Sequence, residues 1–415
     1  MLVSSQAMQF SEIIGQQTTI TRLRSLAQNN RLSHALLFLG KEGSGALPIA
    51  KAFAQYLVCE KVSARKDRQA TTVAPSLFGE ELSPAEENAD MVWEDSCGQC
   101  PSCLKASGSV HPDIHYSYPV VSLAKGDKPP ISEDYASEWR SFINQYPYGN
   151  AYDWLQSIGA ENRQGNITAR ECSKIIHKLS LKSFESGFKI LIMWMPEYLG
   201  DQGNKLLKLI EEPPDDTLFF FVAEQEAKIL PTILSRTQLV RIPPIAPEAM
   251  EDALVKRAGV TTEKARPLAA VSEGNYREAL SLLQHNDEDW QSMTREWLNA
   301  ILKNGPVAVV RWVDEMSKFG REKQKQFLLY VNHLLEESIR LRVMGDTATP
   351  IPENEADFAS RLNKMASISQ QQAMIQEIEQ ASYLIERNAH GKMLFHALSI
   401  KIYHIIKHNS LILIT

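Results

Sequence analysis

A short apolar run that ends in a glycine-rich loop and leads into a helical pattern constrains the fold more than any other feature of the sequence. The run covers Ala35 to Leu39, and the helical pattern after the loop covers about Leu47 to Val58. Two further apolar runs, Lys189 to Met195 and Leu218 to Ala223, also neighbour helical patterns. Buried strands that alternate with helices predict a parallel sheet with helices on both faces.

The sequence changes character after a proline-rich stretch at residues 243–247 and is almost entirely helical in pattern from there onward. One apolar stripe of this region consists of Phe327, Leu328, Val331, Leu334, Leu335 and Ile339. A chain of 415 residues also exceeds the usual size of one domain. We therefore expect an α/β domain over residues 1–242, a small all-α domain over residues 243–290 and a longer all-α domain over residues 291–415.

Two stretches interrupt the α/β pattern. Residues 60–96 start basic and turn acidic, and residues 117–152 are rich in Tyr, Pro and Ser. Runs of this composition are usually solvated and poorly packed. We therefore expect two insertions and assign a function to neither.

Charge and composition exclude several classes of protein. The net charge of -6 argues against a chain that coats nucleic acid or an anionic membrane over its whole surface, although a local basic face remains open. The N-terminus does not resemble a signal sequence, and no apolar run approaches the roughly 18 to 20 residues of a membrane span. These features predict a cytoplasmic protein.

Three of the five cysteines lie within seven positions, at Cys97, Cys100 and Cys103. In a reducing compartment such a cluster favours metal binding over disulfides, and C-x-x-C-x-x-C spacing allows three thiolates to face one ion. Cys59, at the end of the helix after the glycine loop, is the expected fourth ligand. The sequence thus predicts a structural zinc site with four cysteine ligands, because four thiolates leave no position for water.

Other residues compete for, or lie apart from, this site. His111 and His115 are rival fourth ligands, and free thiols remain the alternative to zinc. Cys172 stands alone in a helical stretch and is expected to be a small buried residue.

The glycine loop has the spacing of a phosphate-binding loop but lacks its reactive side chains. Gly40, Gly43 and Gly45 stand after a strand and before a helix, where glycines let backbone N–H groups converge on phosphates. The lysine and hydroxyl residue that should follow are replaced by Ala46 and Leu47. These apolar side chains supply neither a cation for a triphosphate nor a ligand for magnesium.

The acidic pair, which forms the other half of a nucleotide-hydrolysing site, is also missing. The strand from Lys189 should end in an Asp-Glu pair that holds magnesium and orients the attacking water. Counted back from Asn204, those two positions hold Met193 and Trp194. Both losses point in one direction, which is a site that does not hydrolyse a nucleotide.

Several motifs together resemble the bacterial clamp-loader family over about residues 8 to 290. They are Phe10–Gln16, Arg31–Ala35, Asn204–Pro214, Ile229–Arg236 and Glu273–Leu280, with a weaker similarity at Glu386–Met393. Within the family, the degenerate loop and missing acidic pair look like the delta prime type of DNA polymerase III subunit rather than the gamma/tau motor.

The resemblance implies an AAA+ nucleotide-binding domain, a helical lid and a collar that joins a pentameric ring. It implies partners as well, namely gamma/tau motor subunits, the delta subunit, the sliding clamp and primed DNA. Arg236 matches the family's arginine finger, which reaches the ATP site of the neighbouring subunit, although Thr237 stands where the family has cysteine. The family also has the zinc module, with a shorter gap after the first cysteine.

The resemblance gives little functional weight to three other residues. Arg277 matches a lid arginine that contacts nucleotide in its own subunit, but we expect a packing or helix-surface role because Ala46 and Met193 leave it no triphosphate. Glu224 and Gln225 stand where the family has polar threonines. ATP binding by this subunit is therefore not expected.

Two other classes of function remain as alternatives. A gamma/tau-like ATPase would need the missing lysine and acidic pair. A zinc-containing DNA-binding or repair adaptor would bind DNA tightly and in a salt-dependent way, which the acidic balance of the chain disfavours.

Overall fold

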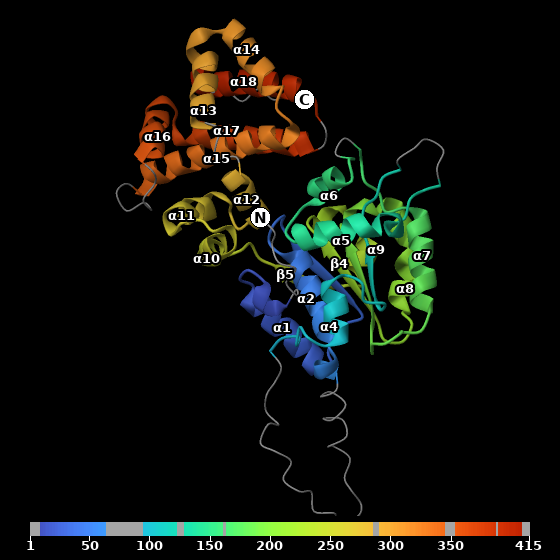
Figure 1. Ribbon diagram of the computed structural model, residues 1–415. Helices are drawn as coiled ribbons and strands as arrows, with labels where there is room; N and C mark the ends of the chain where they lie inside the picture. Colours follow the sequence, from blue (N-terminus) through green and yellow to red (C-terminus); the bar gives the residue numbers. More distant parts are fainter. Residues whose placement is uncertain are drawn as a thin grey trace, which may run out of the picture. The chain divides into compact units, whose positions relative to one another are not determined.

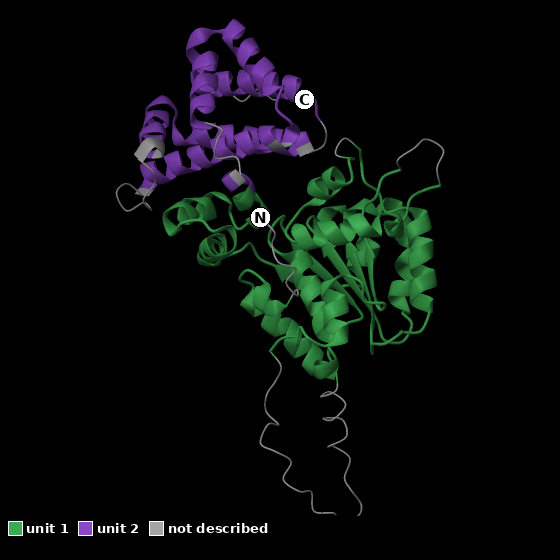
Figure 2. Cartoon of the chain, in the orientation of Figure 1, with its two compact units in different colours: residues 1–280 green, residues 281–415 purple. Residues whose placement is uncertain are grey.

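The chain divides into two compact units, residues 1–280 and residues 281–415, which Figure 2 colours separately. The computed structural model describes residues 9–63, 94–122, 128–160, 163–284, 290–344, 353–386 and 389–408. The predicted division into three domains places a further boundary at residue 243, inside the first unit, and stays a prediction.

Unit 1 is built on a five-stranded parallel sheet with the order β2-β3-β4-β1-β5 (Figure 1). Its strands are β1 (Ala35–Gly40), β2 (Ile114–Ser117), β3 (Lys189–Trp194), β4 (Thr217–Ala223) and β5 (Gln238–Ile242). The three predicted apolar runs are thus strands. Periodicity does not single out β2 and β5, because these edge strands are short and only partly buried.

Two apolar cores lie on the two faces of this sheet. Alternate strand residues separate cleanly, with Phe38 and Phe220 in one core and Leu37 and Phe221 in the other. The first core includes α1 (Gln17–Gln28), α2 (Ala46–Val58), α5 (Ala136–Gln145) and α6 (Ala151–Ser157). The second includes α7 (Ala169–Ser180), α8 (Leu207–Glu211) and α9 (Pro231–Leu234). The predicted parallel sheet with helices on both faces is confirmed.

The second expected insertion is a packed layer and not a solvated loop. Within residues 117–152 the structure describes all but residues 123–127, and Trp139 and Phe142 of α5 are buried there. Trp139 stacks on Tyr118 with ring centroids 4.0 Å apart and meets Trp154 edge-on at 5.3 Å. The aromatic residues that made the segment look unusual are the reason it packs, because each buries a large apolar area. Most of the first insertion, residues 64–93, lies outside the described residues.

Three helices follow the sheet, as the change of pattern after the prolines predicts, and the third of them continues past Leu280, where unit 1 ends. They are α10 (Pro247–Ala258), α11 (Thr262–Val271) and α12 (Tyr276–Gln284), and we call them the lid helices. Gly259 ends α10 in the left-handed conformation, with φ of 69°. Arg257 of α10 donates to the carbonyl of Glu12, so the lid helices also contact the N-terminal segment.

Unit 2 is helical throughout its described residues. Its elements are α13 (Trp290–Asn299), a π-helical turn (Ala300–Asn304), α14 (Pro306–Met316), α15 (Arg321–Met344), α16 (Glu353–Met365), α17 (Ile368–Glu386) and α18 (Gly391–His408). The predicted stripe faces its core: all of its members except the half-buried Ile339 are buried. Among the helices described, none is long and apolar enough to cross a membrane.

Candidate functional site

The glycine loop joins β1 to α2 at the carboxyl edge of the sheet, where parallel α/β folds place ligand sites. Gly43 and Gly45 have φ of 67° and 97°, which only glycine adopts easily. A Cβ atom at Gly43 would lie 1.8 Å from Oδ1 of Asn275, so the residue that precedes α12 lies directly against the loop. The loop therefore keeps the backbone shape that the sequence predicts, while Ala46 and Leu47 begin α2 as buried apolar residues.

The end of β3 carries no acid in the positions where magnesium chemistry requires one. Met193 and Trp194 are both buried, and Trp194 packs against Trp139 at 5.2 Å. The nearest carboxylate that follows, Glu197, accepts the backbone N–H groups of Glu224 and Gln225 at 2.6 and 2.8 Å. Burial raises the pKa of Glu197. This carboxylate holds the end of β4 in place.

A tyrosine from the second expected insertion fills the space over the loop. The ring of Tyr148 would lie 3.0 Å from a Cβ atom at Gly45, and its hydroxyl accepts the N–H of Ile14 at 3.0 Å. Tyr276 of α12 meets the same ring edge-on at 5.1 Å. The space that remains measures about 20 Å³, which holds about one water molecule and is far smaller than a ligand pocket.

Arg277 of α12 lies beside the glycine loop, bound to carboxylates of its own chain. Its Nε and Nη2 donate to the two carboxylate oxygens of Asp153 at 2.6 and 2.8 Å, and Nη1 donates to Glu42 at 3.2 Å. Only 10% of the Arg277 side chain is exposed. Of the two roles weighed for this residue, the structure places it in buried ion pairs and not on the helix surface.

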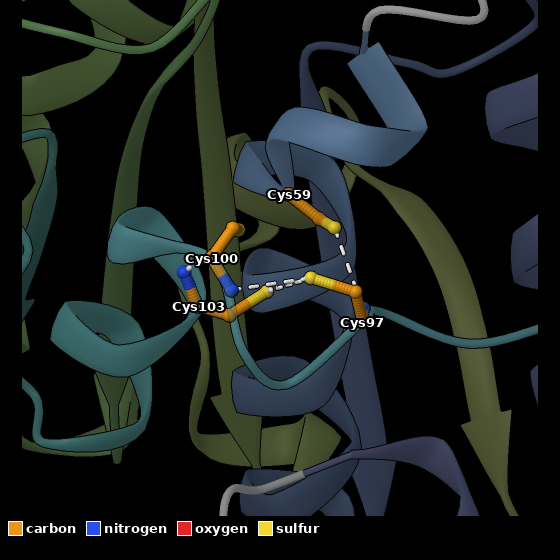
Figure 3. Close-up of side chains that lie close together, drawn as sticks. All are labelled: Cys59, Cys97, Cys100 and Cys103. Atoms are coloured by element: carbon orange, nitrogen blue, oxygen red, sulfur yellow. Dashed lines mark hydrogen bonds between the residues drawn. The ribbon is translucent and has the colours of Figure 1, made fainter.

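Figure 3 shows the four predicted metal ligands, with Cys59 at the end of α2 and Cys97, Cys100 and Cys103 in the loop and first turn of α4 (Pro101–Ser107). Their sulfur atoms all lie within 4.8 Å of one another. Cys97 Sγ and Cys103 Sγ are 3.9 Å apart, close to the roughly 3.8 Å between thiolates on a tetrahedral zinc ion. None of the four forms a disulfide. The structure thus brings together a group that could hold a metal ion.

Backbone N–H groups orient these sulfur atoms. The N–H of Cys97 donates to Cys59 Sγ at 3.4 Å, and that of Cys100 donates to Cys97 Sγ at 3.3 Å. A hydrogen bond from Cys103 lowers the pKa of Cys59 to about 5, while the same contact raises the pKa of Cys103. A bound dication would favour ionisation of all four thiols.

The rival ligands have other partners. Nδ1 of His111 accepts the N–H of Asp113 at 3.1 Å, and its Nε2 lies 3.4 Å from Glu185. Neither His111 nor His115 of β2 belongs to the metal-ligating group found among the described residues. Cys172 is buried in α7, as expected, and burial raises its pKa to about 11.

Arg236 follows α9 and lies on the surface of unit 1, with 34% of its side chain exposed. Its Nε donates to Glu211 of α8 at 2.6 Å, and Nη1 donates to the carbonyl of Thr232 at 2.8 Å. The guanidinium is thus accessible but held by one carboxylate.

Comparisons with known proteins agree on one family. The model of the family described as "DNA polymerase III, delta subunit" matches residues 15–76 and 64–246. The DNA polymerase III subunit delta' of Bacillus subtilis is 25% identical over 65% of this chain and 59% of its own length. A gamma/tau subunit of Mycobacterium bovis is 24% identical over 66% of this chain and 36% of its own length. The chain therefore matches less than two thirds of either relative.

A solved structure of a gamma subunit-related protein from Thermotoga maritima covers 93% of this chain and 99% of its own length. Its sequence identity is 15% and its TM-score is 0.35.

Proposed function

Because the chain belongs to the DNA polymerase III delta subunit family, we propose that it is a delta prime-like subunit of the clamp loader that does not itself hydrolyse ATP. The observation that carries this proposal is the glycine loop, which keeps its backbone shape while Tyr148 fills the space above it. The subunit would act as a fixed part of the ring against which the motor subunits move.

The residues around the loop support the absence of hydrolysis. Phosphoryl transfer needs cations on the terminal phosphates, a metal ligand and a group that orients the attacking water. Ala46, Leu47, Met193 and Trp194 supply none of these. A gamma/tau-like ATPase remains the second candidate, because relatives of that kind match 66% of the chain; the same four residues count against it.

Arg236 would donate its guanidinium to the ATP site of the adjacent gamma/tau subunit. A guanidinium is always charged and presents a rigid fork that fits phosphate oxygens. The side chain is accessible on unit 1, and a neighbouring triphosphate would compete with Glu211 for it. The delta subunit, sliding clamp and primed DNA would then be partners through the assembled complex.

Cys59, Cys97, Cys100 and Cys103 would hold a structural zinc ion. Four sulfur ligands within 4.8 Å of one another fit a closed tetrahedral site. The ion would supply crosslinking and not catalysis. It would tie the end of α2, the helix that begins at the glycine loop, to α4.

The test is replacement of Arg236 by alanine in a complex assembled with the same organism's gamma/tau and delta subunits. Hydrolysis at the site that adjoins Arg236 should fall by a factor on the order of 10³ to 10⁵, so the DNA-stimulated ATPase of the complex loses that site's share. Arg241→Ala, which removes an exposed arginine of β5, is the matched control. An Arg236→Ala complex with full ATPase activity contradicts the finger, and hydrolysis by the isolated chain contradicts the silent site.

A further inference from the structure

We propose that residues 146–153 are a built-in occupant of the degenerate nucleotide site, in which Asp153 takes the place of a phosphate at Arg277 and holds the lid helices closed. We call Glu42, Asp153 and Arg277 the clasp. This proposal goes beyond the proposed function. It concerns only the position of the lid helices in this chain and does not depend on Arg236.

The clasp joins three segments that are far apart in the sequence. Glu42 lies in the glycine loop, Asp153 in the first turn of α6 and Arg277 in the first turn of α12. Asp153 is fixed before it meets the arginine, because its carboxylate also accepts the N–H of Asn150 at 3.2 Å in a capping box. Bidentate pairing of a guanidinium with a planar anion is the geometry that Arg offers to carboxylates and phosphates alike.

The clasp is shielded from water. The Arg277, Asp153 and Glu42 side chains are 10%, 22% and 19% exposed. Screening is weak at such sites, and removal of the Asp153 charge leaves Arg277 with only its longer contacts to Glu42 at 3.2 Å and Glu278 at 3.8 Å. An ion pair of this kind constrains the two elements that it joins far more than an exposed pair does.

The start of α12 also binds the glycine loop directly. The N–H of Tyr276 donates to the carbonyl of Gly43 at 3.2 Å, and Asn275 donates its amide to Glu42 at 3.4 Å. Tyr148 lies between the loop and the ring of Tyr276. The lid therefore rests on the loop through contacts that occupy the place of a ligand.

An internal ligand changes how the lid responds to nucleotide. A ligand shifts an equilibrium only by its differential affinity for the two states, and an anion tethered within the same chain is present at all times. The closed lid is thus the resting state of this protein with or without ATP. The occupant, and not a bound nucleotide, sets the position of the lid.

Hydrogen–deuterium exchange on the full-length chain tests the clasp. Asp153→Asn keeps the capping acceptor and removes the charge, so amides of α10, α12 and residues 41–45 should exchange at least tenfold faster while β3, β4 and unit 2 keep their protection. The matched control is Asp252→Asn, which breaks the exposed Asp252–Lys256 pair of α10 and should leave α12 and the loop unchanged. Millimolar ATP should alter none of these rates in the wild-type protein.

Two outcomes would overturn the proposal. One is faster exchange confined to α6 in Asp153→Asn, because the carboxylate would then serve α6 only. The other is slower exchange of the wild-type lid on addition of ATP. If Asp153→Asn does not fold, Arg277→Lys keeps the charge, loses the bidentate fork and should loosen the same amides; unchanged exchange there counts against the clasp. Neither result bears on Arg236, so failure of the clasp and failure of the proposed function are separable.

Discussion

At the scale of single residues, Lys51 is an unusual member of the first core. It lies in α2 with 3% of its surface exposed and donates to Oδ1 of Asn144 in α5 at 2.8 Å. Burial lowers its pKa from 10.5 to about 7, because a low-dielectric surrounding disfavours the charged amine. A neutral amine that donates to an amide oxygen can be tolerated there, whereas an ammonium ion without a counterion is costly.

Lys51 should therefore make the stability of unit 1 depend on pH. Between pH 7 and about 10 the unfolded chain binds a proton at this lysine that the folded chain does not, so the free energy of unfolding rises with pH by about 1.4 kcal/mol per unit. Below pH 7 both states are protonated and this contribution to the slope vanishes. Denaturant unfolding at pH 7 to 9.5 should give a flatter profile for Lys51→Met than for wild type, and parallel profiles would contradict the shifted pKa. Lys256→Met, an exposed change, should follow wild type.

At the scale of elements, α5 and α6 convert an apparent insertion into the cover of the glycine loop. Trp139 and Trp154 meet at right angles, but their indole N–H groups differ. Nε1 of Trp154 donates to the carbonyl of Pro119 at 2.6 Å, whereas Nε1 of Trp139 has no acceptor among the described residues. The first indole therefore positions a backbone group, and the second contributes packing alone.

The two tryptophans offer a matched pair of substitutions. Trp154→Phe leaves the Pro119 carbonyl buried and unpaired, so it should destabilise unit 1 by about 1–3 kcal/mol more than Trp139→Phe. Trp139→Ala should be severe, at about 3–5 kcal/mol, because it opens a cavity among stacked rings. The denaturant midpoints of the three variants measure the order of their stabilities. Equal midpoints for the two phenylalanine variants would remove the role given to the indole hydrogen bond.

At the scale of the whole molecule, the chain has two units with separate cores. One large cluster of buried side chains gathers around Trp297, Trp312 and Phe327 in unit 2. The four cysteines belong to a small cluster of unit 1 that includes the half-buried Val62. A metal ion at these cysteines would therefore stabilise one unit directly and leave the other untouched.

Metal removal should separate the unfolding transitions of the two units in calorimetry. Purified protein should contain one zinc per chain, and a strong chelator should lower the unfolding temperature of unit 1 while the transition of unit 2 stays in place. Acid should release the ion, because the thiolates become protonated. Cys100→Ser should reduce the bound zinc, and Cys172→Ser should not. Full zinc content in Cys100→Ser would exclude this ligand set.

The local patterns of the sequence were enough for the central strands, the glycine loop and the cysteine cluster. Buried strands such as β3 and β4 are apolar after their first residues, Lys189 and Thr217, and left-handed turns favour glycine. The C-x-x-C-x-x-C spacing needs one tight turn to gather its thiols, so only the distant Cys59 had to be added. Each of these features depends on neighbours within a few residues or on a motif with its own chemistry.

The tertiary structure alone decided what occupies the degenerate site. Tyr148 and the Ile14 amide that it accepts from are 134 residues apart, and Asp153 and Arg277 are 124 residues apart. The aromatic residues of 117–152 favour a packed segment, but the composition does not tell which surface they cover. Contacts over such separations depend on the path that brings distant segments to the same edge of the sheet. Periodicity within one segment carries no information about this path.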